Sequence, residues 1–255
     1  MTAARKLVGV ERALLRAWPS AEMVEVDGWI LRASGGYTKR ANSVNPHFGS
    51  TLPLQEKLDR CEAFYAERRL PTIFRLTPFS VPENLDDVLA ERGYTTLDPT
   101  LVMTRPVRPP DEPKSGDVHD VGAEAWHAAF ESLRRPSAER REHHRWIVDH
   151  ADGERVHAVI EHGGWPIACG LGVLTDDLLG LFDLFTAEAH RRKGNATAVL
   201  DYILARGFER GATSAFLQVH SENSTAQSLY RGFGFDVAYP YWYRIERRNP
   251  DPPAE

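Results

Sequence analysis

A strand that leads through a basic loop into a helix is the feature that most constrains the fold of this 255-residue chain. Residues 181–186 alternate as a β-strand does, so two sets of side chains are expected on opposite faces: Leu181, Asp183 and Phe185, and Phe182, Leu184 and Thr186. The next stretch, Arg191-Arg192-Lys193-Gly194, is basic and ends in glycine. Apolar side chains then recur every three or four positions, which predicts a helix from about Gly194: Ala196, Val199, Leu200, Ile203, Leu204 and Phe208.

A basic glycine loop before a helix predicts a phosphate-binding site. The first N–H groups of a helix have no partner within it and carry a partial positive charge. A glycine lets a large anion approach the backbone, so a strand, a loop and a helix in this order can hold a phosphate. A solvated turn before the helix is the alternative interpretation.

Composition excludes several classes of function. The formal net charge is −5, and the basic run is local, which suits a small anionic ligand better than a nucleic acid. The two cysteines, Cys61 and Cys169, are far apart, and the histidines do not have metal-ligand spacing, so no metal is expected. The N-terminus has no apolar signal region and no apolar stretch approaches twenty residues, so we expect a cytoplasmic protein without a membrane partner.

The first half of the chain reads as a small α/β unit. Periodicity predicts helices over residues 4–18, 54–69 and 83–92, and strands over 23–33, 37–44, 72–76 and 94–107. Ser34-Gly35-Gly36 is expected to form a hairpin-type turn between the first two strands.

A proline-rich segment divides the chain. Residues 106–116 contain four prolines, which neither an interior helix nor a central strand tolerates. We therefore expect a first domain over residues 1–106, a linker over 107–116, a second domain over 117–247 and a disordered tail over 248–255. In the second domain, helices are predicted near 123–133, 137–150, 194–208 and 223–231, and strands near 155–161, 166–175, 181–186, 214–220 and 237–247.

Two motifs of the second half resemble those of the GNAT N-acetyltransferases, which use acetyl-CoA. Arg191-Arg192-Lys193-Gly194-Asn195-Ala196 is similar to the acetyl-CoA loop of that family, Q/R-x-x-G-x-G/A. Asn223-Ser224-Thr225-Ala226-Gln227-Ser228-Leu229-Tyr230, followed by Gly234-Phe235, is similar to its second motif, N-x-x-A-x-x-L-Y with a following GF. Each motif has a predicted strand before it. The resemblance covers residues 117–247 and implies an α/β fold, with a mixed, mostly antiparallel sheet flanked by helices.

The resemblance also implies which residues bind acetyl-CoA as the cosubstrate. The backbone around Gly194 would hold the pyrophosphate, with basic side chains beside it, and the full set is Arg191, Arg192, Lys193, Gly194, Asn195, Ala196 and Thr197. Leu184, Phe185 and Thr186 would offer strand-edge backbone groups to the pantetheine arm, in the manner of a β-pair. Asn223 would cap the last helix and lie against CoA.

The resemblance implies that Tyr230 is the general acid, which gives a proton to the departing CoA thiolate; a core aromatic is the alternative. Many members carry a glutamate base on the strand before the second motif, but this chain has Gln218 there, and a glutamine cannot take a proton. Asp183 is the best substitute, because a carboxylate among apolar residues makes a fair base. A structural acid paired with a cation or the backbone is the alternative for Asp183, and His220 and Glu222 are weaker candidates.

The first half resembles a trimmed copy of the second. Ala90-Glu91-Arg92-Gly93-Tyr94 stands where the second half has residues 230–235, but no basic glycine loop precedes the helix at 54–69. We therefore expect a tandem arrangement, with a degenerate first GNAT-like domain and a catalytic second one. Interfaces between domains often bind ligands, so a further hypothesis assigns four residues to an acceptor pocket there: Trp29, Tyr37, Arg40 and Asn42. Ordinary strand residues of a structural domain are the alternative.

Three functions remain open at this level. The first is an acetyl-CoA-dependent N-acetyltransferase that acts on a primary amine by direct attack in a ternary complex, because no cysteine lies near the motifs to carry an acyl group. The second is a non-catalytic acyl-CoA-binding sensor, which Gln218 favours. The third is a scaffold, which the basic glycine loop disfavours. The acceptor and the acyl length stay open, and the chain is expected to be a monomer or a homodimer.

Overall fold

A computed structural model describes residues 3–49, 51–109 and 117–246. Most of the predicted linker and the predicted tail lie outside these residues. Within the described part of the chain, no helix is both long and apolar enough to cross a membrane. The fold is mixed α/β, with a mostly antiparallel sheet and flanking helices, as the resemblance to the GNAT family implies.

The chain divides into two compact units. Unit 1 comprises Met1–Pro19, Val102–Val219 and Asn223–Ala238, and unit 2 comprises Ser20–Leu101, His220–Glu222 and Tyr239–Glu255. Two strands, β5 (Thr95–Pro106) and β11 (Asp236–Ile245), run through both units.

These units differ from the predicted ranges 1–106 and 117–247 at both ends of the chain. Helix α1 (Ala3–Ala17) belongs to unit 1, where the neighbouring Trp18 stacks on Phe182 at 5.2 Å. The last part of β11 belongs to unit 2, where Tyr243 pairs with Arg75. The assignment of α1 to unit 1 and of the last part of β11 to unit 2 depends on contacts between residues that are distant in sequence. The proline-rich segment, on which the predicted ranges were based, does not reveal such contacts. The interpretation of the first half as a degenerate GNAT-like domain stays a prediction.

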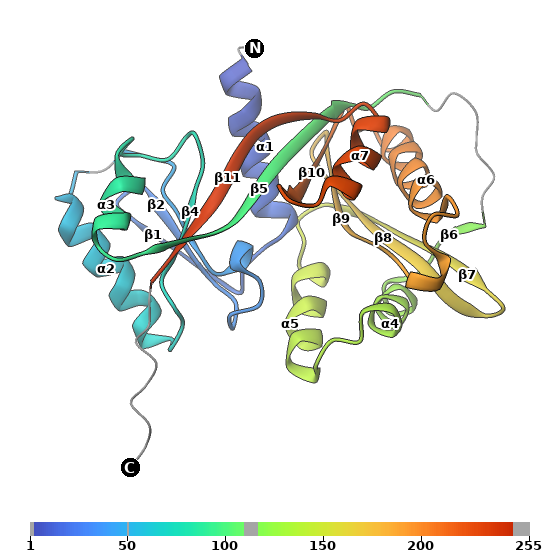
Figure 1. Cartoon of the computed structure of the whole chain (residues 1–255), viewed down its shortest axis with the longest axis horizontal. Coiled ribbons are helices and arrows are strands. Elements are labelled where there is room, and N and C mark those ends of the chain that lie inside the picture. The colour runs from blue at the N-terminus through green and yellow to red at the C-terminus, as the bar shows by residue number, and fades with distance from the viewer. Residues whose placement is uncertain (1–2, 50, 110–116, 247–255) are drawn as a thin grey trace. The chain divides into compact units, whose positions relative to one another are not determined.

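Unit 1 is a sheet with helices on both faces. Its strands follow the order β5-β10-β9-β8-β7-β6, with β9 and β10 parallel and the pairs from β9 to β6 antiparallel. The strands are β6 (Val118–Asp120), β7 (Glu154–His162), β8 (Trp165–Thr175), β9 (Leu178–Thr186) and β10 (Ser214–His220). The remaining helices are α4 (Ala123–Arg134), α5 (Ala138–Asp149), α6 (Asn195–Glu209) and α7 (Ser224–Gly232). Helices α6 and α7 lie on one side of the sheet and α4 and α5 on the other (Figure 1).

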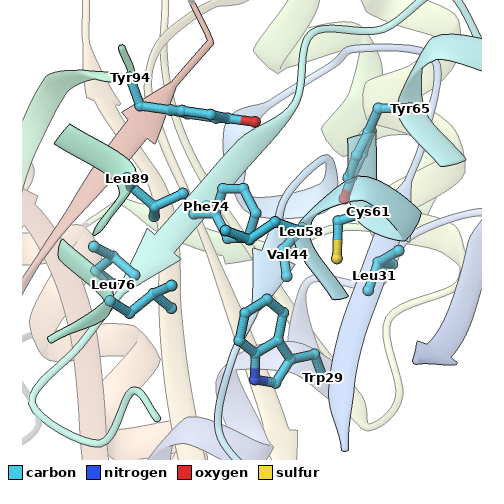
Figure 2. Close-up of a cluster of buried hydrophobic side chains, with 11 residues drawn as sticks. Trp29, Leu31, Val44, Leu58, Cys61, Tyr65, Phe74, Leu76, Leu89 and Tyr94 are labelled. Atoms are coloured by element: carbon cyan, nitrogen blue, oxygen red, sulfur yellow. The ribbon is translucent and has the colours of Figure 1, made fainter. Parts of the chain in front are cut away.

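The strands of unit 2 follow the order β1-β2-β3-β4-β11, and β3 and β4 are parallel. Its elements are β1 (Glu22–Val26), β2 (Trp29–Ala33), the 3-10 turn η1 (Lys39–Ala41), β3 (Val44–Asn45), α2 (Leu54–Glu67), β4 (Ile73–Leu76) and α3 (Leu85–Glu91). The core of this unit gathers apolar side chains from strands β2, β3 and β4 and from helices α2 and α3 (Figure 2). Aromatic rings form its centre, with Trp29 edge-on to Phe74 at 5.9 Å.

The structure differs from the predicted strands of the first half in two places. The predicted strand 23–33 is a hairpin, because Asp27 and Gly28 have φ angles of 46° and 86° and turn β1 into β2. The predicted strand 37–44 is instead the turn η1 followed by the short β3. The physical reason is Asn42, whose side chain bonds to the backbone of residues 34–38 and satisfies groups that a strand would have to pair.

Candidate active site

Strand β9 is interrupted at Asp183 by a β-bulge. Two residues of β9, Asp183 and Leu184, lie opposite one residue of β8, Gly170. Asp183 has a φ angle of 50°, in the left-handed region that aspartate enters more readily than most residues. A bulge of this kind bends its strand and changes the direction in which the following side chains point.

The bulge overturns the predicted alternation of this strand. The Trp18 ring stacks on Phe182 and lies 6.0 Å from the ring of His144, and His144 hydrogen-bonds to Asp183. Phe182 and Asp183 therefore lie on the same side of the sheet, although the sequence places them on opposite faces. The extra residue at the bulge is the cause, and it cannot be seen from the pattern of a single strand.

Beyond the bulge, β9 separates from its parallel neighbour β10. Residues 214–217 of β10 pair with residues 178–181 of β9. Both strands continue beyond these residues without pairing to each other. Residues 184–186 lie in this unpaired continuation. The Oγ1 atom of Thr186 is buried and has no hydrogen-bond partner among the described residues. This strand edge is therefore open to a ligand that carries amide groups.

The basic loop meets helix α6 at Gly194. Gly194 has a φ angle of 83° and a Cβ atom added to it would meet no other group within 4 Å, so the space beside its backbone is open. The first helical hydrogen bond is donated by the Ala198 N–H to the Gly194 carbonyl, at 2.9 Å. The N–H groups of residues 195–197 precede that bond and point out of the helix end. The Asn195 side chain fastens the loop by donating to the His190 carbonyl at 2.8 Å.

The cations of this loop have different positions. The Arg191 guanidinium donates to the Thr186 carbonyl at 3.2 Å and lies 6.0 Å from the centre of the Phe185 ring, so it covers the end of β9. Arg192 and Lys193 are exposed. The loop therefore presents positive charge beside the N-terminus of α6.

One pocket of about 1010 Å³ contains all of the residues predicted to bind the cosubstrate. Its walls are the end of β9, the segment from Glu188 to Thr197, which includes the first turn of α6, and helix α7. The predicted residues among its lining are Leu184, Phe185, Thr186, Arg191, Arg192, Lys193, Gly194, Asn195, Ala196, Thr197, Asn223 and Tyr230. Asp183 is not among the lining residues, although it directly precedes Leu184.

Helix α7 forms the far wall of the pocket. Asn223 caps the helix as predicted, because its side chain accepts a hydrogen bond from the Ala226 N–H at 3.1 Å. Burial raises the pKa of Tyr230 to about 12, so its hydroxyl is protonated at neutral pH. Sequence reasoning assigned no role to the pocket residues Ala226 and Leu229, although both are fixed positions of the second motif.

Asp183 has a specific partner on the other side of the sheet. Its Oδ2 atom lies 2.9 Å from Nε2 of His144, and its side chain is 17% exposed. His144 is buried, and its ring stacks on Phe130 at 4.1 Å. The Asp183 carbonyl also accepts a long contact from the thiol of Cys169.

The four predicted acceptor residues lie in unit 2. Trp29 is 0% exposed, and its indole N–H donates to the Val81 carbonyl, so its ring offers no surface to an acceptor. Asn42 is buried and holds the turn described above, which gives it a structural role. Tyr37 and Arg40 are partly exposed, and their role in acceptor binding stays a prediction.

Comparisons with known proteins identify the family. The model of the family described as probable histone acetyltransferase Rv0428c, C-terminal, matches residues 4–244, which is nearly the whole chain. The chain belongs to this family of GNAT N-acetyltransferases. It is therefore an acyltransferase, and the family implies acetyl-CoA as its cosubstrate.

Relatives and solved structures agree with this assignment. The chain is 31% identical to the uncharacterized N-acetyltransferase YobR of Bacillus subtilis, over 93% of this chain and 98% of the relative. It is 26% identical to the probable histone acetyltransferase Rv0428c of Mycobacterium tuberculosis, over 88% of this chain and 69% of the relative. The fold is similar to that of a GCN5-related N-acetyltransferase from Kribbella flavida, with a TM-score of 0.68 and 17% identity over 97% of this chain and 96% of the other.

Proposed function

We propose that this GNAT protein transfers the acetyl group of acetyl-CoA to a primary amine by direct attack, with both substrates bound at once. The observation that carries the proposal is the pocket of about 1010 Å³ in unit 1. It combines the N-terminus of α6, the open edge of β9 and the Tyr230 side chain. These three parts match the three parts of the cosubstrate: a pyrophosphate, an amide-bearing arm and a thioester.

The residues present fit acetyl-CoA. The outward N–H groups of residues 195–197 and the open space at Gly194 suit a pyrophosphate, and Arg192 and Lys193 add charge complementary to it. The amides of the pantetheine arm can pair with the backbone of residues 184–186, where β10 no longer does. The buried Oγ1 of Thr186 gains a partner in the same place.

The chemistry needs two proton transfers and no covalent enzyme intermediate. The amine nitrogen forms a bond to the thioester carbon, and the bond between that carbon and sulfur breaks. Asp183 takes the proton of the amine, directly or through water, and Tyr230 gives its proton to the CoA thiolate. Backbone N–H groups of residues 184–186 are the natural donors to the carbonyl oxygen as it becomes negative.

The two cysteines support direct attack. A covalent acyl-enzyme needs a thiolate, but Cys61 and Cys169 are both buried. Burial raises the pKa of the Cys61 thiol to about 12 and raises that of Cys169 further. Both thiols are therefore neutral and poorly nucleophilic at physiological pH.

Calorimetric titration with acetyl-CoA tests the proposed site. We expect wild-type protein to bind and Gly194→Glu to lose binding, because the glutamate would place a negative side chain in the phosphate site. Gly211→Glu is the matched control, because Gly211 has a φ angle of 92°, an equally open surrounding, and a place at the other end of α6. It should bind as wild type does. Failure of wild type to bind, or unchanged binding by Gly194→Glu, would contradict the proposal.

A further inference from the structure

We propose that His144 is a positioning residue for acetyl transfer, which holds the Asp183 carboxylate ready to take the proton of the acceptor amine. The inference rests on the proposed function, in which Asp183 is the base. His144 Nε2 lies 2.9 Å from one carboxylate oxygen, Oδ2, and because a carboxylate base can only accept, the proposal assigns the hydrogen to Nε2. The other oxygen is left to accept the proton, and the side chain is still 17% exposed.

The position of the His144 ring is set by its neighbours. It stacks on Phe130 with ring centres 4.1 Å apart and planes inclined by 10°, and Trp126 lies nearly parallel to it at 6.0 Å. Trp18 closes a further side at 6.0 Å. A ring held by aromatic side chains from α4 and from the end of α1 presents its Nε2–H in one direction.

Asp183, which contacts the His144 ring, lies next to the cosubstrate pocket of unit 1. Asp183 has a left-handed backbone within a strand, a conformation that persists only where surrounding contacts hold it. The next residue, Leu184, is the first of β9 to line the pocket. The contact from His144 therefore holds the Asp183 carboxylate in place. It also holds the backbone at the point where β9 continues into the cosubstrate pocket.

A second histidine–aspartate pair, between helices α4 and α5, has similar geometry but lies outside β9. His127 of α4 is buried, and its Nε2 lies 2.9 Å from Oδ1 of Asp149, so atom type and distance match those of the first pair. However, Asp149 ends helix α5 and its side chain is 45% exposed, whereas that of Asp183 is 17% exposed. The carboxylate of one pair lies in β9 and that of the other at the end of α5, so His127, whose ring meets that of His144 edge-on at 6.3 Å, is the comparison for His144.

Three variants of the full chain separate positioning from packing. His144→Phe keeps an aromatic ring against Phe130 but removes the N–H donor. His144→Gln keeps an N–H donor at a reach similar to that of Nε2. His127→Phe removes the equivalent ring nitrogen from the His127–Asp149 pair. The thermal unfolding and the acetyl-CoA Kd of each variant are measured first. A loss of the fold or of cosubstrate binding can then be distinguished from a loss of catalytic rate.

Two probe amines distinguish a proton-transfer role from general damage. Propylamine is protonated at neutral pH and must lose a proton before it can attack, whereas hydroxylamine is uncharged and loses its proton only after the new bond has formed, so it depends less on a base. We expect His144→Phe to lower kcat with propylamine by at least about tenfold, with the acetyl-CoA KM changed less than about twofold. Turnover of hydroxylamine should stay within about twofold of wild type, and His144→Gln should recover most of the rate with propylamine.

The outcomes are decisive for the inference. If His144→Phe is as active with propylamine as His127→Phe, or if it loses both amines equally, His144 has only a structural role and the inference is wrong. If wild type binds acetyl-CoA but turns over neither amine, the positioning role is overturned together with the proposed base. If wild type does not bind acetyl-CoA, the proposed function itself has failed, which the calorimetry shows separately.

Discussion

A Cβ atom placed on Gly170 of strand β8 would lie 2.6 Å from Cγ1 of Val199 in helix α6. The same atom would lie 2.9 Å from Cδ1 of Ile203, one turn further along the helix. Glycine at this position therefore lets α6 pack against the sheet more closely than any side chain would permit. Because the N-terminus of α6 is one wall of the pocket, this close packing also sets the distance between the basic loop and β9.

The first prediction concerns this contact. Gly170→Ala should lower the free energy of unfolding by about 1–3 kcal/mol, because valine is stiff and cannot move away from the added methyl group. Gly9→Ala is the control, because Gly9 lies within α1 with no group near its missing Cβ, and alanine there should be neutral or stabilising. Denaturant unfolding of both variants measures the effect. Equal stability of the two variants would show that α6 is free to shift.

The second prediction concerns the general acid. Tyr230→Phe should lower kcat by about 100-fold while the acetyl-CoA Kd stays near that of wild type, because only the proton donor is removed. Burial raises the pKa of Tyr230 to about 12, so its deprotonation should cause no loss of kcat until the pH approaches that value. Steady-state kinetics against pH measures both points. A variant with wild-type kcat would leave Tyr230 as a core aromatic only.

The third prediction concerns the thiols. Iodoacetamide reacts with thiolates, and both thiols are buried with raised pKa values, so native protein should resist alkylation and keep its activity. Mass spectrometry should show two modified cysteines, Cys61 and Cys169, only after unfolding in urea. Rapid alkylation of native protein with loss of activity would instead favour a covalent acyl-enzyme.

The fourth prediction concerns stability in acid. Asp27 accepts backbone hydrogen bonds from Leu52 and Thr51 and lies near Lys57, and the Leu52 bond is the main reason that its pKa is lowered to about 2. A lowered pKa in the folded state means that Asp27 stabilises the fold above its ordinary pKa near 3.8 and loses this contribution as the pH falls through about 2.

Asp27→Ala should therefore lower Tm at neutral pH, and the difference from wild type should shrink as the pH falls from 4 towards 2. Thermal unfolding at a series of pH values measures this. The exposed Glu25 of the neighbouring strand provides the comparison, and Glu25→Ala should change Tm little throughout. A difference between Asp27→Ala and wild type that does not depend on pH would contradict the assigned role of the carboxylate.

Much of the candidate site could be predicted from sequence because it depends on neighbours in the chain. The glycine loop, the start of α6 and the Asn223 cap each use hydrogen bonds between residues at most a few positions apart. The two motifs that resemble GNAT sequences lie in these local structures, and the family assignment agrees with them. The helical periodicity of α6 is likewise a local property, and four of its predicted apolar positions, Val199, Leu200, Ile203 and Leu204, are buried.

The rest was decided by the tertiary structure. The bulge at Asp183 exists only because β9 pairs with β8, so the predicted alternation fails there. His144 reaches Asp183 from 39 positions away, and the pattern of its charged helix does not reveal that contact. Asn42 turns a predicted strand into a 3-10 turn by bonding to the backbone around it. The sequence by itself determined the local elements and the family, because periodicity and capping act over a few residues. The tertiary structure determined which side chains meet across the sheet, because those contacts depend on strand register and on packing between distant segments.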